Sequence, residues 1–244
     1  MGMDQLRINY PQPALTFYIF RYILKADWQV FTALATRQGS DLRVIAGQYR
    51  SRPLRSLRGL EIRPTSDRLR ETLFNVLTAG NPSALEGSIW LDLYAGTGAV
   101  GIEALSRGAA KVYFVEVSSA AVKIIHENLK SLPITSCVEV IQADVGKVLR
   151  RLQRDRFNPD LVFLDPPYRL EQAYHDTLNL VGQASWLKTT TIVIVEHLKK
   201  FDPGETFASL ARFRRLHQGD ASLSFYRLAK CLESGGDPRA RRMG

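Results

Sequence analysis

The chain has 244 residues, 45% of them hydrophobic, and a formal net charge of +9, which suits a globular protein with one large domain, or one domain with additions. Two cysteines, Cys137 and Cys231, provide neither a disulfide framework nor a C-x-x-C spacing, and the four histidines form no H-x-x-x-H pair. We therefore expect no metal site and a reducing, cytosol-like compartment.

Residues 1–40 are predicted to be an extension outside the main fold. The apolar stretch 14–24 (A-L-T-F-Y-I-F-R-Y-I-L) contains Arg21 and is too short to span a bilayer. It lacks the small-residue cleavage site of a secretory signal. An extra docking helix, translation from an upstream start and an organellar transit peptide all stay open. We expect a cytoplasmic protein with no membrane contact, and import into an organelle is the alternative.

Positive charge is concentrated in residues 41–70, where eight arginines stand against three acids. Arginine suits bidentate contact with phosphate, so this strip predicts a surface for a polyanion; a solvated charged face is the alternative. Short β-type pieces, Leu42–Ala46 and Ser51–Leu57, flank Gly47, and Pro53 restricts the second to a sheet edge. We expect a small Arg-rich β appendage over residues 41–62.

A helix is predicted from about Ser66 to Gly80. Ser66 suits the N-cap, Asp67 suits the first turn, and Gly80-Asn81-Pro82 ends the helix. Its apolar stripe consists of Leu69, Leu73, Val76 and Leu77. Arg68 and Arg70 fall off this stripe and are the positions of functional interest.

From Ser88 the chain alternates between strands and helices. The predicted strands are Ile89–Tyr94, Lys111–Val117, Val138–Gln142, Asp160–Asp165 and Thr189–Glu196. The predicted helices are Ala99–Arg107, Ser119–Ser131, Val145–Arg154 and Glu171–Gln183. This order predicts a parallel, doubly wound α/β sheet with strand order 3-2-1-4-5. Leu210–Leu216 and Ser222–Leu228 predict a closing antiparallel hairpin, so the main domain covers residues 63–229 and a flexible tail covers 230–244.

The stretch Ile89–Gly101 (I-W-L-D-L-Y-A-G-T-G-A-V-G) passes from a strand through a glycine-rich turn into a helix. Such a turn offers backbone N–H groups to the polar part of a nucleotide-like ligand. Three acids, Glu116, Asp144 and Asp165, stand at or just beyond the ends of the next three strands. Ligands bind outside the carboxyl ends of strands, and an acid about 20 residues after the glycines suits ribose hydroxyls. The set predicts an adenosine-type ligand.

The fourth strand ends in Asp165-Pro166-Pro167-Tyr168. Two prolines fix the backbone and remove two N–H donors, so a rigid turn presents a carboxylate, carbonyl oxygens and an aromatic face. This set matches an exocyclic amine on a nucleobase, because two oxygens accept its N–H bonds while the tyrosine stacks on the ring. Holding the amine in this way aims its lone pair at an electrophile. A loop stiffener with a tyrosine lid is the structural alternative.

Taken together, L-D-L-Y-A-G-T-G and D-P-P-Y resemble class I S-adenosylmethionine-dependent methyltransferases that modify exocyclic amines. The Arg-rich leader R-V-I-A-G-Q-Y-R-S-R-P-L and R-P-T-S-D-R-L-R-E-T-L-F-N-V-L resemble RsmD-type enzymes, which methylate the N2 amine of a guanine in 16S rRNA. The resemblance covers about Leu42–Leu228. It implies a Rossmann-like class I sheet with an antiparallel C-terminal hairpin, S-adenosyl-L-methionine as cofactor, and a monomer acting on 16S rRNA within a small-subunit assembly particle.

The resemblance also implies residue roles. The residues expected to hold the cofactor are Thr65, Asp92, Tyr94, Ala95, Gly96, Gly98, Glu116, Val117, Asp144, Val145 and Asp165. The residues expected to hold and orient the target amine are Asp165, Pro166, Pro167 and Tyr168. The residues expected to contact RNA are Arg43, Arg50, Arg52, Arg55, Arg58, Arg63, Arg68 and Arg70.

Three other functions stay open at this point. The D-P-P-Y turn equally suits adenine-N6 methylation of DNA, although no separate DNA-recognition domain is visible. The spacing of Gly96, Gly98 and Gly101 with Glu116 also suits a nicotinamide dehydrogenase. That function leaves Asp92, Asp165 and the arginine strip unexplained. A non-catalytic rRNA-binding factor could keep the fold alone, but the intact acids argue against it.

Overall fold

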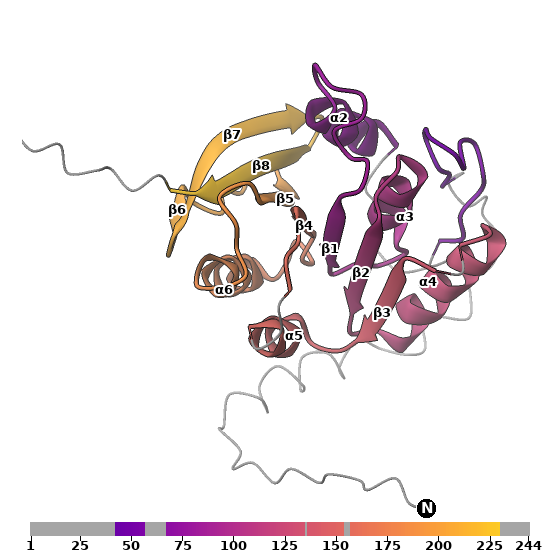
Figure 1. The fold of residues 1–244 in the computed structure, drawn as a ribbon. Helices are drawn as coiled ribbons and strands as arrows, with labels where there is room; N and C mark the ends of the chain where they lie inside the picture. The colour runs from indigo at the N-terminus through magenta and orange to yellow at the C-terminus, as the bar shows by residue number, and fades with distance from the viewer. Residues whose placement is uncertain (1–41, 57–66, 135, 154–156, 230–244) are drawn as a thin grey trace, which may run out of the picture. The chain divides into compact units, whose positions relative to one another are not determined.

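A single mixed sheet organises the computed structural model, which describes residues 42–56, 67–134, 136–153 and 157–229 (Figure 1). Its strands are β1 (Ile89–Leu93), β2 (Lys111–Glu116), β3 (Val138–Gln142), β4 (Leu161–Leu164), β5 (Ile192–Leu198), β6 (Thr206–Phe207), β7 (Leu210–Gln218) and β8 (Ala221–Leu228). The helices are α2 (Asp67–Leu77), α3 (Ala99–Ser106), α4 (Ser119–Ser131), α5 (Val145–Leu152) and α6 (Glu171–Gly182). None of these described helices is long and apolar enough to cross a membrane.

The strand order is β3-β2-β1-β4-β5-β8-β7-β6. β1 to β5 pair in parallel, and β8 joins β5 in antiparallel fashion. The expected order 3-2-1-4-5 and the closing hairpin are therefore confirmed. β1 and β4 are neighbours, so the turns that follow them leave the sheet side by side. This is the position where doubly wound sheets bind ligands.

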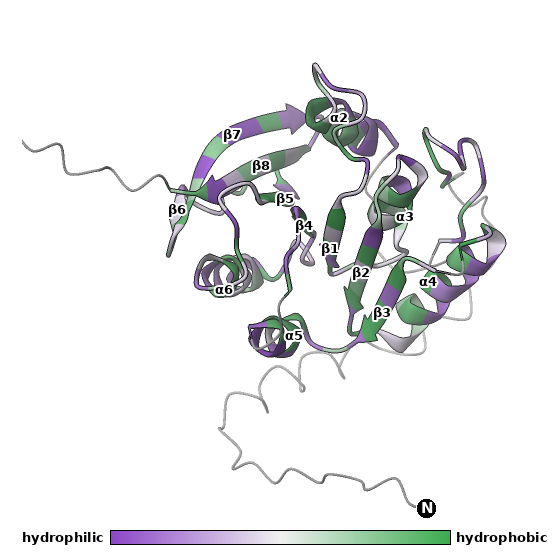
Figure 2. Ribbon diagram, in the orientation of Figure 1, coloured by the Kyte–Doolittle hydropathy of each residue, from purple (hydrophilic) through white to green (hydrophobic). Residues whose placement is uncertain are grey.

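Two hydrophobic cores lie on opposite faces of the sheet. The first packs apolar side chains of α2, α3 and α4 against the sheet, and the second packs those of α5 and α6. The inner strands β1, β4 and β5 are largely hydrophobic, whereas β7 carries several polar residues (Figure 2). Continuous apolar strands with helices on both faces are the arrangement that the sequence predicts.

Several element boundaries differ from the prediction. The fifth strand runs from Ile192 to Leu198 rather than from Thr189 to Glu196, because residues 189 and 190 form a turn after α6. The short strand β6 was not predicted, since two residues carry no usable periodicity. The helix after β2 matches its predicted bounds, and the Ser118 hydroxyl caps it by accepting the Ala121 N–H at 3.3 Å.

The basic segment 42–56 doubles back as an irregular hairpin rather than as two regular strands, and the Leu54 N–H donates across it to the Leu42 carbonyl oxygen at 2.7 Å. One isolated antiparallel bridge joins Arg43 to Pro53, so the predicted pair of short β-strands is not formed. The buried carboxylate of Glu103 on α3 fixes the turn by accepting the N–H groups of Ile45 at 2.7 Å and Ala46 at 3.0 Å. The segment is thus anchored to the helix that follows the glycine turn.

Gly101 is required for packing between α3 and β2. A Cβ atom at this position would lie 2.3 Å from Phe114 Cε1 and 2.7 Å from Val112 Cγ1. The third glycine of G-x-G-x-x-G therefore lets the helix approach the sheet, while Gly96 and Gly98 adopt positive φ angles of 54° and 76°.

We expect Gly101→Ala to lower the free energy of unfolding by about 1–3 kcal/mol, because the buried ring of Phe114 has little room to move. Urea denaturation measures this change. The control is Gly146→Ala in the first turn of α5, where the new Cβ would meet only side-chain atoms of Arg150 and Asp144 at 3.3 Å or more. The control should be neutral or stabilising. Equal losses in the two variants would contradict the packing role of Gly101.

Candidate active site

Four acidic side chains gather on one face of the sheet at the carboxyl ends of its parallel strands. Side chains alternate between the two faces of a strand. Trp90, Phe114, Phe163 and Ile194 belong to the core on the α2–α3 face. Two residues further along each strand, the same face therefore carries Asp92, Glu116, Asp165 and Glu196.

Asp92 lies in β1 beneath the glycine turn. Its carboxylate accepts the Gly101 N–H at 3.0 Å, and the residue is 2% exposed. Burial raises its pKa to about 8, against the lowering effect of the Gly101 hydrogen bond, and the charge of Glu116 raises it further. A buried acid in this state favours a cationic group beside it, since a cation would stabilise the ionised form.

Glu116 connects β2 to the glycine turn. Its two oxygens accept the N–H groups of Gly96 at 2.9 Å and Ser118 at 2.8 Å. The next residue, Val117, is 62% exposed, so an apolar surface stands open beside the carboxylate. Asp144 caps α5 by accepting the Lys147 N–H at 3.1 Å, and its side chain is exposed.

Asp165 and Glu196 stand on neighbouring strands. Leu164 and Val195 are register partners, so the two acids follow side by side. The pKa of Asp165 is raised well above its usual value, first by burial of its carboxyl, then by the charges of Glu196 and Asp92. Glu196 is 2% exposed and accepts the Tyr168 O–H at 2.8 Å.

Glu196 is the site residue that sequence reasoning missed. In the sequence, Glu196 is only the last residue of the predicted fifth strand. The available signal was an acid ending a buried strand on the same face as Asp165, which needed the correct strand register to be seen. Glu196 ties the D-P-P-Y turn to β5 through Tyr168.

The D-P-P-Y turn itself is fixed from α6. Pro166 is buried, and its carbonyl oxygen accepts the Tyr174 O–H at 3.1 Å, while Pro167 is exposed and Tyr168 half-buried. One of the carbonyls expected to receive the target amine thus already holds a tyrosine, although a carbonyl oxygen can accept two bonds.

Tyr94 and Ala95 lie between β1 and the glycines. Tyr94 has a φ of 60°, and its hydroxyl lies 2.7 Å from Thr177 Oγ1 of α6. Its ring is therefore directed toward α6, so that its predicted cofactor contact falls to its backbone. Ala95 and Val145 are buried near the turn and at the start of α5.

The predicted RNA-contacting arginines divide into several groups. Arg50 and Arg52 are exposed, and no ion pair holds them within the part of the chain that the structure describes. Arg43 pairs with Asp67 at 3.3 Å and Arg55 with Glu127 at 2.7 Å, with arginine side chains 61% and 69% exposed. Arg68 is exposed on α2. Thr65, Arg58 and Arg63 lie outside the described residues.

The prediction that Arg70 lies on the exposed side of α2 is wrong. Arg70 is fully buried, and its Nη2 donates to the Arg43 carbonyl oxygen at 2.9 Å and to Asp67 at 2.6 Å. A helix with a wide buried face places residue 70 beside Leu69, Leu73 and Phe74. Arg70 therefore holds the basic segment to α2 instead of presenting a charge to RNA.

Asn128 joins the basic segment to the glycine turn. This buried amide on α4 accepts the Arg55 N–H at 2.7 Å and donates to the Arg55 and Thr97 carbonyl oxygens at 3.1 and 2.9 Å. Hydrogen bonds through Asn128 thus connect the arginine-rich segment to the candidate cofactor loop.

The sheet order, the antiparallel closure by β7 and β8, and the carboxylates around a glycine turn define a class I methyltransferase. A family model described as Conserved hypothetical protein 95 matches residues 42–227. The chain belongs to this family, which contains the RsmD-type methyltransferases.

Named relatives and a solved structure agree with this family. The chain is 38% identical over 157 residues to Ribosomal RNA small subunit methyltransferase D of Haemophilus influenzae, covering 64% of this chain and 78% of that protein. It is 35% identical over 155 residues to the Escherichia coli protein of the same name, covering 64% and 74%. The structure of "Putative methyltransferase yhhF" from Escherichia coli superposes with a TM-score of 0.65 at 29% identity, covering 78% of this chain and 99% of that one.

Proposed function

We propose that this protein transfers a methyl group from S-adenosyl-L-methionine to the exocyclic N2 amine of a guanine in small-subunit ribosomal RNA. The observation that carries the proposal is the position of Asp165 on the same face of the sheet as Asp92 and Glu116, whose carboxylates hold the glycine turn. The printed names of the relatives, small-subunit rRNA methyltransferases, support rRNA as the substrate class. The choice of guanine N2 rests on the D-P-P-Y turn and on the RsmD-type resemblance.

The residues present fit the proposed cofactor. S-adenosylmethionine supplies an electrophilic methyl group on a positively charged sulfonium, and its amino-acid end carries an ammonium group. Asp92 and Asp165 are acids whose pKa values are raised by burial, so a cation nearby restores their ionised forms. The dehydrogenase alternative leaves Asp92 and the D-P-P-Y turn without a role.

The cofactor's parts have separate partners in this proposal. Asp92 and the backbone at Ala95–Gly98 would hold the methionine part, and Glu116 would accept the ribose hydroxyls. Val117 offers an exposed apolar surface for the adenine ring, and Asp144 offers a carboxylate for the adenine amine. Each role matches a group that the turn or a strand end presents.

Asp165 and the turn after it would act on the target base. The carboxylate accepts an N–H of the amine and leaves the nitrogen lone pair directed outward, so catalysis is by positioning. Tyr168, held by Glu196 at 2.8 Å, offers its ring as a stacking surface. The amine can release its proton after transfer, so a strong general base is not required. The base must leave its stack to reach this turn.

Nucleoside analysis tests the proposal directly. Purified protein and tritiated S-adenosylmethionine are incubated with unmodified small-subunit rRNA, both naked and assembled into particles, and in a separate reaction with duplex DNA. We expect label in N2-methylguanosine alone, with the assembled particle the better substrate and the enzyme acting as a monomer. Label in N6-methyladenine with a DNA substrate would favour the alternative function. No transfer to any substrate, with the cofactor still bound, would indicate a binding factor.

A further inference from the structure

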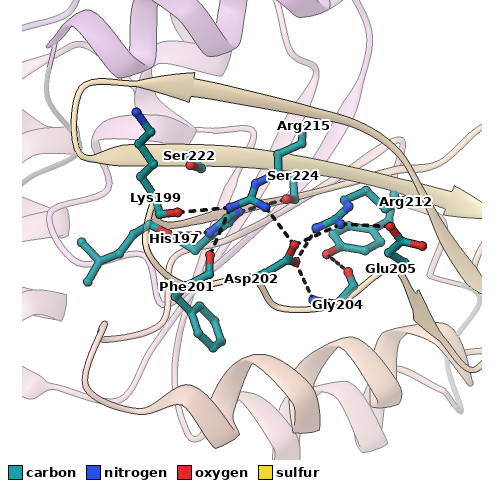
Figure 3. Close-up of polar contacts among 12 residues, drawn as sticks. His197, Lys199, Phe201, Asp202, Gly204, Glu205, Arg212, Arg215, Ser222 and Ser224 are labelled. Atoms are coloured by element: carbon teal, nitrogen blue, oxygen red, sulfur yellow. Dashed lines mark hydrogen bonds and ion pairs between the residues drawn. The ribbon is translucent and has the colours of Figure 1, made fainter.

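The described segment between β5 and β6 contains no helix, and several side chains hold it (Figure 3). Asp202 accepts Arg212 Nη1 at 2.5 Å, Arg215 Nη1 at 2.8 Å and the Gly204 N–H at 2.9 Å. Arg215 Nη2 also donates to the carbonyl oxygens of Lys199 at 3.2 Å and Phe201 at 3.3 Å. Residues 199–204 therefore have a fixed course.

A β-bulge in β7 makes this arrangement possible. Arg212 pairs with Tyr226 and Arg215 with Ser224, with one extra residue between Arg212 and Arg214. Tyr226 and Ser224 share a face of β8, so the bulge brings both arginines to that face, where they reach Asp202 together. In a regular strand, residues 212 and 215 would lie on opposite faces. The hydrogen bond from Arg212 lowers the pKa of Asp202 to about 2, so the carboxylate stays charged.

The segment held in this way follows directly on β5, and the end of β5 borders the proposed target site. Leu198 continues the alternation of β5 and lies two residues beyond Glu196 on the same face, where it is 36% exposed. Glu196 is hydrogen-bonded to Tyr168, so the end of β5 lies directly against the D-P-P-Y turn. An exposed leucine here is unusual, since the described residues expose only three other large apolar side chains to this degree.

Two cations follow this leucine. Lys199 and Lys200 are exposed, and no ion pair holds either of them within the described ranges. The side chain of Lys199 points away from the Asp202 network in Figure 3. Its backbone is fixed on both sides, because its N–H donates to the Asp220 carbonyl oxygen at 2.8 Å and its own carbonyl accepts Arg215.

We propose that Leu198, Lys199 and Lys200 form an RNA-contacting surface beside the target guanine, with Leu198 against a neighbouring base and the lysines on backbone phosphates. This surface rests on the function proposed above and lies outside the arginine strip of residues 43–70. An unstacked nucleotide chain offers alternating apolar rings and negative charges, which one apolar and two cationic side chains in sequence complement. The rigid backbone lets the contact form with little loss of conformational entropy.

The test compares Lys199→Gln/Lys200→Gln with Lys111→Gln/Lys130→Gln. The second pair removes the same charge at the amino end of β2 and at the last turn of α4, on the opposite edge of the sheet. We expect the first variant to raise the KM for rRNA about tenfold, with kcat and cofactor affinity within about twofold of wild type. The slope of log kcat/KM against log salt should become shallower by ~1.4, at roughly 0.7 for each phosphate contact to a single strand. The control should keep the wild-type slope.

Leu198→Ser separates the apolar contact from the charges. It should lower kcat/KM about fivefold and leave the salt slope unchanged. If the lysine double variant and Leu198→Ser both behave like the control, the proposed surface is wrong. Effects seen with particles, but absent in binding of protein-free rRNA, would assign the surface to a ribosomal protein and equally overturn it. Analysis of the wild-type product is an independent test. A nucleoside other than N2-methylguanosine would contradict the proposed function and leave the proposed RNA contact unaffected.

Discussion

Replacement of Asp165 by alanine is expected to lower kcat for rRNA methylation by at least ~10³ while S-adenosylmethionine still binds. The carboxylate is the acceptor that would orient the target amine, and its neighbours Glu196 and Tyr168 are hydrogen-bonded to each other at 2.8 Å. Single-turnover methylation and calorimetric titration of the cofactor measure the two quantities. Near-normal turnover in this variant would contradict the mechanism.

Asp165→Asn separates this role from a structural one. The ionised form of Asp165 destabilises the folded protein, since burial and the charges of Glu196 and Asp92 raise the pKa of its carboxyl. A neutral amide of the same shape removes that cost, so we expect a higher melting temperature than wild type together with a large loss of turnover. Such a combination excludes unfolding as the reason for inactivity. A loss of stability in Asp165→Asn would instead indicate that the carboxylate supports the fold.

Glu196→Gln provides a second comparison at the same place. Removing the charge of Glu196 eliminates one cause of the raised pKa of Asp165. The pH at which turnover reaches half its maximum should therefore move down, because Asp165 ionises more easily, while Tyr168 still has an oxygen to donate to. A pH–rate profile that does not move would show that Glu196 acts only through packing.

The parallel part of the fold could be predicted because each strand is a short apolar run bounded by turn residues. The helix over residues 119–131 and the strand over 138–142 were predicted at their observed bounds. The glycine turn and three of the four acids also followed from the sequence, because strand ends and loops are the positions where ligand groups stand.

The remaining features depend on contacts that no local pattern encodes. Glu196 joins the acids only through the register of β4 with β5. The burial of Arg70 depends on the carbonyl of Arg43, 27 residues earlier. The basic segment predicts two short strands, yet hydrogen bonds to Glu103, 57 and 58 residues away, hold it as an irregular hairpin with a single bridge. Tertiary partners overrode local propensity in each case.

The second large effect is expected at Asp92, whose burial makes the free energy of unfolding depend on pH. The pKa of its carboxyl is about 8 in the folded protein, against 3.8 without the fold, and burial is the main cause. Between these values the folded chain holds a proton that the unfolded chain releases, so the stability from the neutral acid is lost as pH rises. The free energy of unfolding should fall by up to about 1.4 kcal/mol per pH unit in this window and level off above pH 8.

Asp92→Asn should both remove this pH dependence of stability and weaken cofactor binding. The amide oxygen still accepts the Gly101 N–H, so the variant should fold with a flatter pH profile and exceed wild-type stability at pH 8. The lost charge should weaken S-adenosylmethionine binding by about 10- to 100-fold, which is the range for a charge-assisted hydrogen bond.

Wild type should also release up to about one proton on binding at pH 6.5, because a cation beside the acid favours its ionised form. Calorimetry in buffers of different ionisation enthalpy measures that proton. Equal proton release by wild type and Asp92→Asn would place the coupling elsewhere, with Asp165 the next acid to replace, since its pKa is raised by the same burial.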